Sequence, residues 1–367
     1  MANVETIKVL HVITRADVGG ITSLLYNYFT NMSQGNVVFH VVAIGTAYTQ
    51  RYQKIFEDLG MRVFFMPEKI TRRLAYLWTL IRKERYDVVH SHVELVSAIY
   101  LWVAMLAGNK VRVAHTHLAV DNKGWKNKIL QLLLNKVATH RVGCSKMAIT
   151  KLFGPKYTDR ATVIANAINA SEYVFDSAVR QALQQELQIE DKYVVGFVGR
   201  LTKLKNIPYL LEVFKTLKEK KEDVVLLLVG DGEMQGEIEA KVKELGIVPD
   251  VKFLHTRIDV NHLLMAMDVL LFPSFSEGFG LVMVEAQAAA LKCIAALNRV
   301  SKETSISDYA HYEAIEKPAT VWADLILDQC MDYERVNMEQ EVAKHHFDVR
   351  IEADKLIDFY NKTVREN

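Results

Sequence analysis

Hydrophobic and polar residues alternate along the chain in two kinds of segment, short apolar runs and longer amphipathic stretches. The apolar runs have the length and the β-branched content that are typical of buried strands. In the first half they predict strands at residues 8–13, 37–44, 62–66, 87–90 and 111–115. Between them, apolar residues recur at helical spacing, as in residues 21–32, 50–59 and 73–84. The first half therefore predicts a sheet whose strands are linked by helices.

The same pattern starts again in the second half of the chain. It predicts strands at residues 193–198, 224–229, 251–254, 269–273 and 293–296. Strands that alternate with helices form parallel sheets, so two such series predict two Rossmann-like α/β domains. Parallel sheets bind ligands at the carboxyl ends of their strands. We therefore expect the site in a cleft between two facing sheets, on residues that directly follow strands.

The domain boundaries follow from the same pattern. We expect one domain at residues 1–170, a second at 171–345 and a C-terminal helix within 346–367, with the joint in the polar stretch 169–190. A chain of 367 residues is long enough to form two domains of ordinary size.

The composition is that of an ordinary globular protein, with 50% hydrophobic and 24% charged residues. The start of the chain lacks the basic and apolar regions of a signal peptide. The longest apolar stretch, residues 95–108, is shorter than the roughly 20 residues of a membrane-spanning helix. Three cysteines lie far apart without zinc-like spacing, which favours a reducing cytoplasm. They are Cys144, Cys293 and Cys330.

The charge is distributed unevenly, although the whole chain carries only +1. Residues 1–170 contain 22 basic and 10 acidic residues, a net charge of +12, and the remainder carries −11. A basic half suits an anionic membrane or a phosphorylated acceptor, and simple surface solvation is the alternative.

The strongest motif runs from Glu277 to Glu285 and reads Glu-Gly-Phe-Gly-Leu-Val-Met-Val-Glu. It follows a predicted strand and opens a helix near Leu281. Gly278 and Gly280 allow close approach of a ligand to the backbone, and the helix N-terminus suits a diphosphate. Glu285 is placed to bind ribose hydroxyls and Glu277 to orient a sugar. A plain helix start with two acidic residues is the structural alternative.

A second motif, Gly-Arg-Leu-Thr-Lys-Leu-Lys-Asn at residues 199–206, also follows a strand. The guanidinium of Arg200 and the ammonium of Lys205 are suited to a diphosphate leaving group. A basic loop that enters a helix is the alternative. Gly-Asp-Gly at residues 230–232 is a weaker motif that also fits a simple turn.

Two further features lie in the first half. Gly19 and Gly20 resemble a phosphate-binding turn, but no G-x-G-x-x-G follows, so a dinucleotide fingerprint is absent. Histidine pairs close two strands, and alternation places each pair on one face: His90 with His92, and His115 with His117. Neither a carboxylate cluster nor an Asp-x-Asp triplet accompanies them, so we expect no metal, and a structural role for His90.

Together these motifs resemble glycosyltransferase family 4, which has the GT-B fold, and in particular its bacterial exopolysaccharide and capsule enzymes. The resemblance extends nearly end to end, through the Gly19-Gly20 loop, DVVHSH, VAHTH, VIANAIN, GRLTKLKN, VGDGE and FPSFSEGFGLVMVEAQAAA. It implies a retaining, metal-independent transfer of a hexose-type sugar from a nucleoside diphosphate donor to an acceptor hydroxyl, and resemblance to the exopolysaccharide group favours UDP as the nucleotide. No metal cofactor is required in such a mechanism.

The resemblance also implies roles for single residues. Arg200 and Lys205 neutralise the leaving diphosphate, with backbone N–H groups at Gly280 and Leu281. The remaining donor-binding residues are Gly19, Gly20, Glu277, Gly278, Phe279 and Glu285. His115 lines the transfer site, with His117 and His92 as further candidates on the acceptor side. A helix at residues 349–363 crosses back to the first domain.

The chain departs from the family pattern at several positions. Ala290 and Lys292 replace a usual Gly and Pro, residues 296–303 replace a Ser-Asp-x-Gly-Gly stretch, and the Gly expected near His255 is absent. These changes concern base recognition and donor identity rather than the phosphate and ribose residues.

The implied partners are a nucleotide sugar and a lipid-linked or glycan acceptor, with peripheral contact to an anionic membrane and no nucleic acid. The implied location is cytoplasmic, at the inner face of the cell membrane. Three alternatives stay open: a nucleotide-sugar 2-epimerase on the same fold, a non-catalytic partner subunit, and a transferase for a soluble acceptor.

Overall fold

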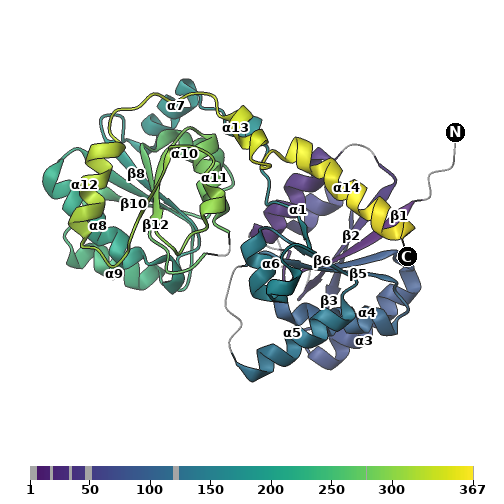
Figure 1. The fold of residues 1–367 in the computed structure, drawn as a ribbon. Coiled ribbons are helices and arrows are strands. Elements are labelled where there is room, and N and C mark those ends of the chain that lie inside the picture. Colours follow the sequence, from purple (N-terminus) through teal and green to yellow (C-terminus); the bar gives the residue numbers. More distant parts are fainter. Residues whose placement is uncertain are drawn as a thin grey trace. The chain divides into compact units, whose positions relative to one another are not determined.

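The computed structural model describes residues 6–16, 20–32, 35–45, 52–118, 124–277 and 279–366. The chain divides into two compact units. Unit 1 contains Met1–Asn169 and His346–Asn367, and unit 2 contains Ala170–His345. Each unit is built on one parallel sheet, as the alternation of strands and helices predicts (Figure 1).

The sheet of unit 1 has the strand order β3-β2-β1-β4-β5-β6-β7 among the described residues. Its strands are β1 Ile7–Val12, β2 Val37–Ile44, β3 Arg62–Met66, β4 Val88–Ser91, β5 Val111–Thr116, β6 His140–Gly143 and β7 Thr162–Val163. Its helices are α1 Gly20–Asn31, α2 Tyr52–Asp58, α3 Ile70–Glu84, α4 Ser97–Leu106, α5 Trp125–Val137, α6 Lys146–Phe153 and α14 Val349–Arg365.

Helices cover both faces of this sheet. One face packs against α3, α4, α5 and α6, and the other packs against α1, α2 and α14. The C-terminal segment joins the unit through backbone bonds, since Ile168 N donates to Phe347 O at 2.8 Å and Val349 N donates to Ile168 O at 2.8 Å. The side chain of Asp348 then caps α14 by accepting from Arg350 N. Burial of apolar area against both faces is the main stabilising contribution.

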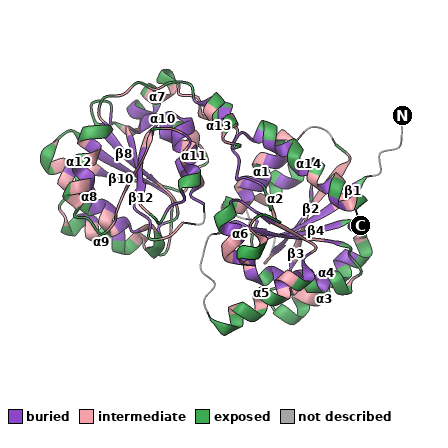
Figure 2. Ribbon diagram, viewed as in Figure 1, coloured by how far each residue is buried: buried purple, intermediate pink, exposed green. Residues whose placement is uncertain are grey.

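The sheet of unit 2 has the order β10-β9-β8-β11-β12-β13. Its strands are β8 Tyr193–Val198, β9 Val224–Val229, β10 Val251–His255, β11 Val269–Phe272, β12 Lys292–Ala296 and β13 Ala310–Glu313. Its helices are α7 Ser177–Leu187, α8 Ile207–Lys220, α9 Gln235–Glu244, α10 Val260–Ala266, α11 Leu281–Ala288, α12 Ala319–Gln329 and α13 Glu339–Lys344. Strands β8, β9, β11 and β12 are buried along most of their length, β10 and β13 are only partly buried, and most of the helices keep one exposed side (Figure 2).

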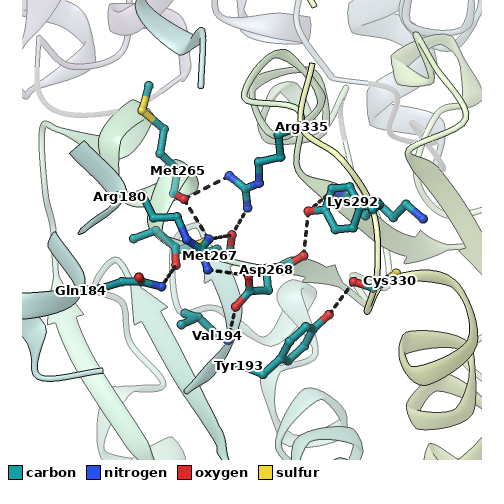
Figure 3. A network of polar contacts seen from close by, with 12 residues as sticks. Arg180, Gln184, Tyr193, Val194, Met265, Met267, Asp268, Lys292, Cys330 and Arg335 are labelled. Carbon is teal, nitrogen blue, oxygen red and sulfur yellow. Dashed lines mark hydrogen bonds and ion pairs between the residues drawn. The ribbon is translucent and has the colours of Figure 1, made fainter. Parts of the chain in front are cut away.

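A polar network closes the amino-terminal edge of this second sheet (Figure 3). Asp268 binds Arg180 Nη2 at 2.7 Å and accepts from Val194 N at 2.7 Å. Arg335 donates to the carbonyl of Met265 at 3.0 Å, at the end of α10. Carbonyls at a helix end lack partners within the helix, and here the guanidiniums of Arg180 and Arg335 donate hydrogen bonds to them. The network thus ties α7, α10 and the segment after α12 to the sheet.

Candidate functional site

The site residues of unit 2 lie in loops at the carboxyl edge of its sheet, after β8 and β11. The Lys205 ammonium and the Glu277 carboxylate form an ion pair, with Nζ 2.6 Å from Oε1. Their side chains are only 19% and 9% exposed, and Lys205 Nζ also lies 4.8 Å from the centre of the Phe272 ring. The structure therefore joins the second and the first sequence motif in one charged pair.

Backbone contacts hold these two loops together. Asn206 adopts a left-handed conformation with φ 53° and donates from Nδ2 to Pro273 O at 3.2 Å. Phe275 N donates to Leu204 O at 2.8 Å. An asparagine tolerates this conformation better than most residues, which explains its place at the end of the loop.

Arg200 stands apart from this pair. Its side chain is exposed, and within the described residues it makes no hydrogen bond or ion pair. A Cβ on Gly230 would lie 2.1 Å from Gly199 O, and one on Gly232 would lie 2.2 Å from Leu201 O. The Gly-Asp-Gly segment is therefore more than a turn, because its missing side chains let the loop that carries Arg200 pack against it.

The glutamate motif enters α11 through a left-handed turn that glycine adopts without strain. Gly280 has φ 84° at the N-cap, and a Cβ there would lie 3.2 Å from Val300 and 3.9 Å from Glu277 Cγ. Leu281 begins the helix, and Phe279 is buried, whereas Gly278 lies outside the described residues. The start of α11 therefore lies next to the Glu277 side chain, and the N–H groups of a helix's first turn lack helical partners and can bind an anion.

Glu285 lies one turn into α11. Tyr173 Oη donates to its Oε1 at 3.2 Å. Burial raises the pKa of the Glu285 carboxyl to about 7, and the hydrogen bond from Tyr173 acts in the opposite direction. Among the described residues, no hydrogen bond or ion pair joins Glu285 to Arg200, Lys205 or Glu277, so Glu285 lies at the same edge without a direct link to them.

Five histidines form one buried cluster at the carboxyl edge of the sheet in unit 1. His11 and His90 are register partners of β1 and β4, and the alternation of β4 and β5 turns the other three to the same face. The cluster consists of His11, His90, His92, His115 and His117, and no ring is more than 7% exposed. Gly20 begins α1 in this unit and an added Cβ would meet nothing within 4 Å, whereas Gly19 lies outside the described residues.

Hydrogen bonds link the rings into two chains. His117 Nε2 lies 2.9 Å from His92 Nδ1, and His92 Nε2 lies 2.9 Å from His11 Nδ1. In the second chain His115 Nδ1 lies 3.1 Å from His90 Nε2, and His90 Nδ1 lies 2.6 Å from the hydroxyl of Tyr360 on α14. Two buried ring nitrogens, His11 Nε2 and His115 Nε2, have no partner among the described residues.

Burial keeps all five rings neutral. Desolvation lowers the pKa of His11 to about 3 and that of His117 to about 4, with a hydrogen bond to Asn166 opposing the shift at His117. The pKa values of His90, His92 and His115 are also well below 6.5, first because of burial and then because of neighbouring rings. Neutral imidazoles can accept a proton or a hydrogen bond, and they can ligate a metal.

The cluster also contains two sets of three rings whose ligand atoms lie within 4.8 Å of one another. They are His11 with His90 and His92, and His92 with His115 and His117. Four hydrogen bonds already occupy most of the ring nitrogens of the cluster. That the protein requires no metal stays a prediction.

Sequence reasoning missed two residues of this region. His11 lies in the middle of an apolar strand, and only the register of β1 with β4 brings it to the other histidines. Glu94, with φ 49°, accepts from His117 N and from Thr116 Oγ1, each at 2.8 Å. Burial raises the pKa of the Glu94 carboxyl to about 7, although these hydrogen bonds lower it. Glu94 therefore fixes the end of β5 that carries His117.

Two departures from the family pattern have a conformational explanation. His255 has φ 52° and Ala290 has φ 50°, so both occupy the left-handed region that glycine adopts at the least cost. His255 Nδ1 lies 2.7 Å from Asp231 Oδ1, a contact that helps to hold this backbone. The fold at these turns is thus kept without the glycines.

Comparison with known proteins agrees with this geometry. A family model for "Glycosyltransferase Family 4" matches residues 18–172, and one for "Glycosyl transferases group 1" matches residues 179–342. EpsF of Bacillus subtilis is 27% identical, and the alignment covers 98% of each chain. The UDP-Gal:alpha-D-GlcNAc-diphosphoundecaprenol alpha-1,3-galactosyltransferase of Escherichia coli is 28% identical over 65% of this chain and 66% of its own. The crystal structure of Anabaena HepE in complex with UDP and glucose superposes with a TM-score of 0.82 at 18% identity, covering 97% of this chain and 100% of that one.

Two units built on parallel Rossmann-like sheets have the GT-B fold, and the two matching family models define the chain as a glycosyltransferase. Within that class, the chain belongs to glycosyltransferase family 4.

Proposed function

We propose that this protein is a retaining transferase that moves a hexose-type sugar from a nucleoside diphosphate, with UDP favoured, to an acceptor hydroxyl. The acceptor in this proposal is a lipid-linked intermediate of exopolysaccharide or capsule synthesis. The observation that carries the proposal is the partly buried Lys205–Glu277 pair beside the start of α11. A cation and free N–H groups at one strand edge suit a departing diphosphate.

Each residue of unit 2 has one role in this scheme. Arg200 and Lys205 neutralise charge on the leaving diphosphate, and N–H groups at Gly280 and Leu281 add hydrogen bonds. The ionised carboxylate of Glu285 accepts from ribose hydroxyls. Glu277, already fixed by Lys205, orients the hydroxyls of the transferred sugar. The names of the galactosyltransferase and of the HepE complex, which contain UDP, support the choice of nucleotide.

Retention follows if the acceptor attacks on the face that the phosphate leaves. The bond between the anomeric carbon and the phosphate oxygen breaks, and a bond to the acceptor oxygen forms on the same side. The acceptor proton passes to the departing phosphate oxygen, so the step needs no carboxylate nucleophile. On the acceptor side we assign His115 to the transfer site, with His92 and His117 beside it, because their neutral rings accept hydrogen bonds.

A nucleotide screen tests the donor site. We expect UDP or a UDP-sugar to raise the melting temperature selectively, because a ligand at about 100 times its Kd stabilises by about 2.7 kcal/mol. In Glu285→Gln the nucleotide shift should disappear. The nucleotide-free variant should at the same time be more stable at pH 8 by up to about 3 kcal/mol, because it need not ionise a buried carboxyl whose pKa rises from 4.5 to about 7 on folding.

A response to every nucleotide alike, or one that Glu285→Gln leaves intact, would contradict the assigned donor site. Incubation of the responding nucleotide sugar without an acceptor separates transfer from epimerisation, because only an epimerase would form a new epimer.

Removal of divalent metal tests the proposed mechanism. We expect sugar transfer to continue in excess EDTA at an unchanged rate, because Arg200 and Lys205 supply the positive charge that a metal would otherwise provide. The assay is product formation with and without EDTA, with added Mg²⁺ and Zn²⁺ as controls. A strict dependence on a divalent ion would refute the metal-free scheme.

The acceptor class is proposed from the surface of unit 1. Helix α5 exposes an apolar stripe at helical spacing, in which Trp125 and Leu132 are each 70% exposed and Ile129 is 55% exposed. Helix α4 packs between α3 and α5 and exposes Leu106 to 56%. Helices α3 and α5, with the residues that cap α3, also carry nine basic residues: Lys69, Arg72, Arg73, Arg82, Lys83, Arg85, Lys126, Lys128 and Lys136. Apolar groups among cations favour the surface of an anionic membrane.

The described residues contain no helix with the length and apolar character of a membrane span. The galactosyltransferase from Escherichia coli is named for an acceptor linked to diphosphoundecaprenol, a lipid, which supports attachment at the membrane surface. We therefore propose peripheral contact of α3, α4 and α5 with the inner face of the cell membrane.

Vesicle flotation tests this contact. We expect binding to vesicles that contain phosphatidylglycerol at low salt, and weaker binding at high salt because exposed charges are screened. Trp125→Ser with Leu132→Ser should lower the bound fraction about tenfold or more, since both side chains lose apolar contact with lipid. Ile258→Ser removes an apolar side chain that is 94% exposed in unit 2 and should change nothing. Equal flotation of all three proteins would refute the assigned face.

A further inference from the structure

Unit 1 contains a cavity of about 930 Å³ that the proposed transfer does not use. It lies at the amino-terminal edge of the sheet, where Ile7 begins β1 and Val111 begins β5. The last turn of α3 and the end of α14 complete its wall. The transfer residues follow the opposite ends of the strands, and a six-residue strand spans about 20 Å. The cavity is therefore separate from the histidine cluster.

The charged residues of the wall are unbalanced. Four cationic side chains line the cavity against one carboxylate, that of Asp87. They are Arg82, Arg85, Lys110 and Arg365, and none has an acidic partner among the described residues. Asp87 is engaged elsewhere, because its Oδ2 accepts from Lys8 N at 2.7 Å. Cations that converge on a concave surface raise the local concentration of anions.

A buried amide adds a second, independent requirement. Asn109 is only 6% exposed, and its Nδ2 donates to the carbonyls of Tyr86 at 2.8 Å and of Asp87 at 3.2 Å. These two acceptors fix the orientation of the amide, since a flipped group would set oxygen against oxygen. Its Oδ1 is left buried without a partner among the described residues. A buried acceptor of this kind calls for a donor from a ligand or water.

We infer that this cavity binds a phosphate ester that also carries a hydroxyl group. The phosphate is held by the four cations, and the hydroxyl donates to Asn109 Oδ1. A glycerophosphate fits both requirements, either as the headgroup of a lipid or as a free metabolite-sized anion. Guanidinium groups favour phosphate because they offer paired donors.

Calorimetric titration of the full chain with sn-glycerol 3-phosphate at low salt tests the inference. Glycerol lacks the phosphate and inorganic phosphate lacks the carbon-bound hydroxyl, so we expect no binding of glycerol and weaker binding of phosphate. Arg85→Glu with Lys110→Glu should weaken glycerol 3-phosphate about tenfold or more. Lys54→Glu with Lys156→Glu makes the same charge change at exposed positions of unit 1 outside the cavity and should alter binding less than about twofold.

The donor site of unit 2 also attracts phosphate, so the titration is repeated with Arg200→Ala and Lys205→Ala combined. Binding by the cavity persists in that variant. The assignment would be overturned if binding disappears in that variant, or if Lys54→Glu with Lys156→Glu weakens it as much as the cavity variant does. The absence of saturable binding of either soluble phosphate would also overturn it, unless vesicles bind as described next.

Vesicles separate the two sources of the ligand. Binding to phosphatidylglycerol vesicles that falls more in Arg85→Glu with Lys110→Glu than in the charge-matched Lys126→Glu with Lys128→Glu on α5, without binding of the soluble ester, assigns the site to a lipid headgroup. An equal loss in both variants would assign vesicle binding to the membrane face alone and overturn the inference. Binding of the soluble ester assigns it to a free anion. Asn109→Ser adds a check on the amide, because it should remove the preference for glycerol 3-phosphate over inorganic phosphate while charge-dependent binding remains.

Discussion

Replacing Arg200 with alanine is expected to lower the kcat of sugar transfer by about a hundredfold, which corresponds to about 2.7 kcal/mol of transition-state stabilisation. The guanidinium is exposed and without a polar partner among the described residues, so its loss should leave the melting temperature unchanged. The effect therefore reports on charge at the leaving group alone. Arg200→Lys should recover only part of the rate, because an ammonium lacks the paired donors.

Lys205→Ala should lower the kcat of sugar transfer at least as much as Arg200→Ala does. It removes a cation and also leaves the Glu277 carboxylate, 9% exposed, without its partner. Lys203→Ala is the matched control, since Lys203 lies in the same short helical turn and is exposed. Steady-state rates with saturating donor separate kcat from binding. Wild-type turnover in Arg200→Ala, or an equal loss in Lys203→Ala, would refute the proposed clamp.

Acid is expected to unfold unit 1 between about pH 6 and pH 5, because a buried histidine must gain a proton on unfolding. In the folded state His11 has a pKa of about 3 and His117 of about 4, against 6.5 when unfolded. The unfolded chain thus binds more protons than the folded chain in this pH range. The contribution of the neutral histidines to the free energy of unfolding is therefore complete above pH 6.5 and decreases as the pH falls.

The free energy of unfolding is expected to change steeply with pH. Each of the five rings contributes about 1.4 kcal/mol per pH unit, and Glu94, whose pKa is raised to about 7, offsets one of them. The remaining four contributions amount to about 5.6 kcal/mol per pH unit, which is comparable with the total stability of a domain, about 5–15 kcal/mol.

Urea unfolding at several pH values checks this expectation. Replacing one ring, as in His11→Asn, should reduce the slope by about 1.4 kcal/mol per unit. His262→Asn removes an exposed histidine of unit 2 and serves as the control. A slope that is the same in all three proteins would show that the cluster does not govern acid stability.

Much of the fold could be predicted from the sequence. Two series of apolar runs predict two parallel sheets, and the structure confirms this fold class. Short or half-exposed strands were missed, namely β6 His140–Gly143, β7 Thr162–Val163 and β13 Ala310–Glu313. Each has only two to four residues, and β13 is not fully buried at any position, so its pattern of apolar residues is weak.

For the candidate site, the sequence by itself determined which residues follow strands, and with them the motifs of Lys205, Glu277 and Glu285. A residue at a strand end is a local property, set by hydrophobic periodicity and glycine positions. Residue roles toward donor and acceptor stay predictions that the proposed variants test.

Only the tertiary structure decided which of these residues meet. The 2.6 Å pair of Lys205 and Glu277 joins positions 72 residues apart, and strand register alone brings His11 to His90. Tyr360 reaches the same cluster from the C-terminal helix. Periodicity along a chain carries no information on such contacts, because strand order and register are set by the packing of the whole sheet.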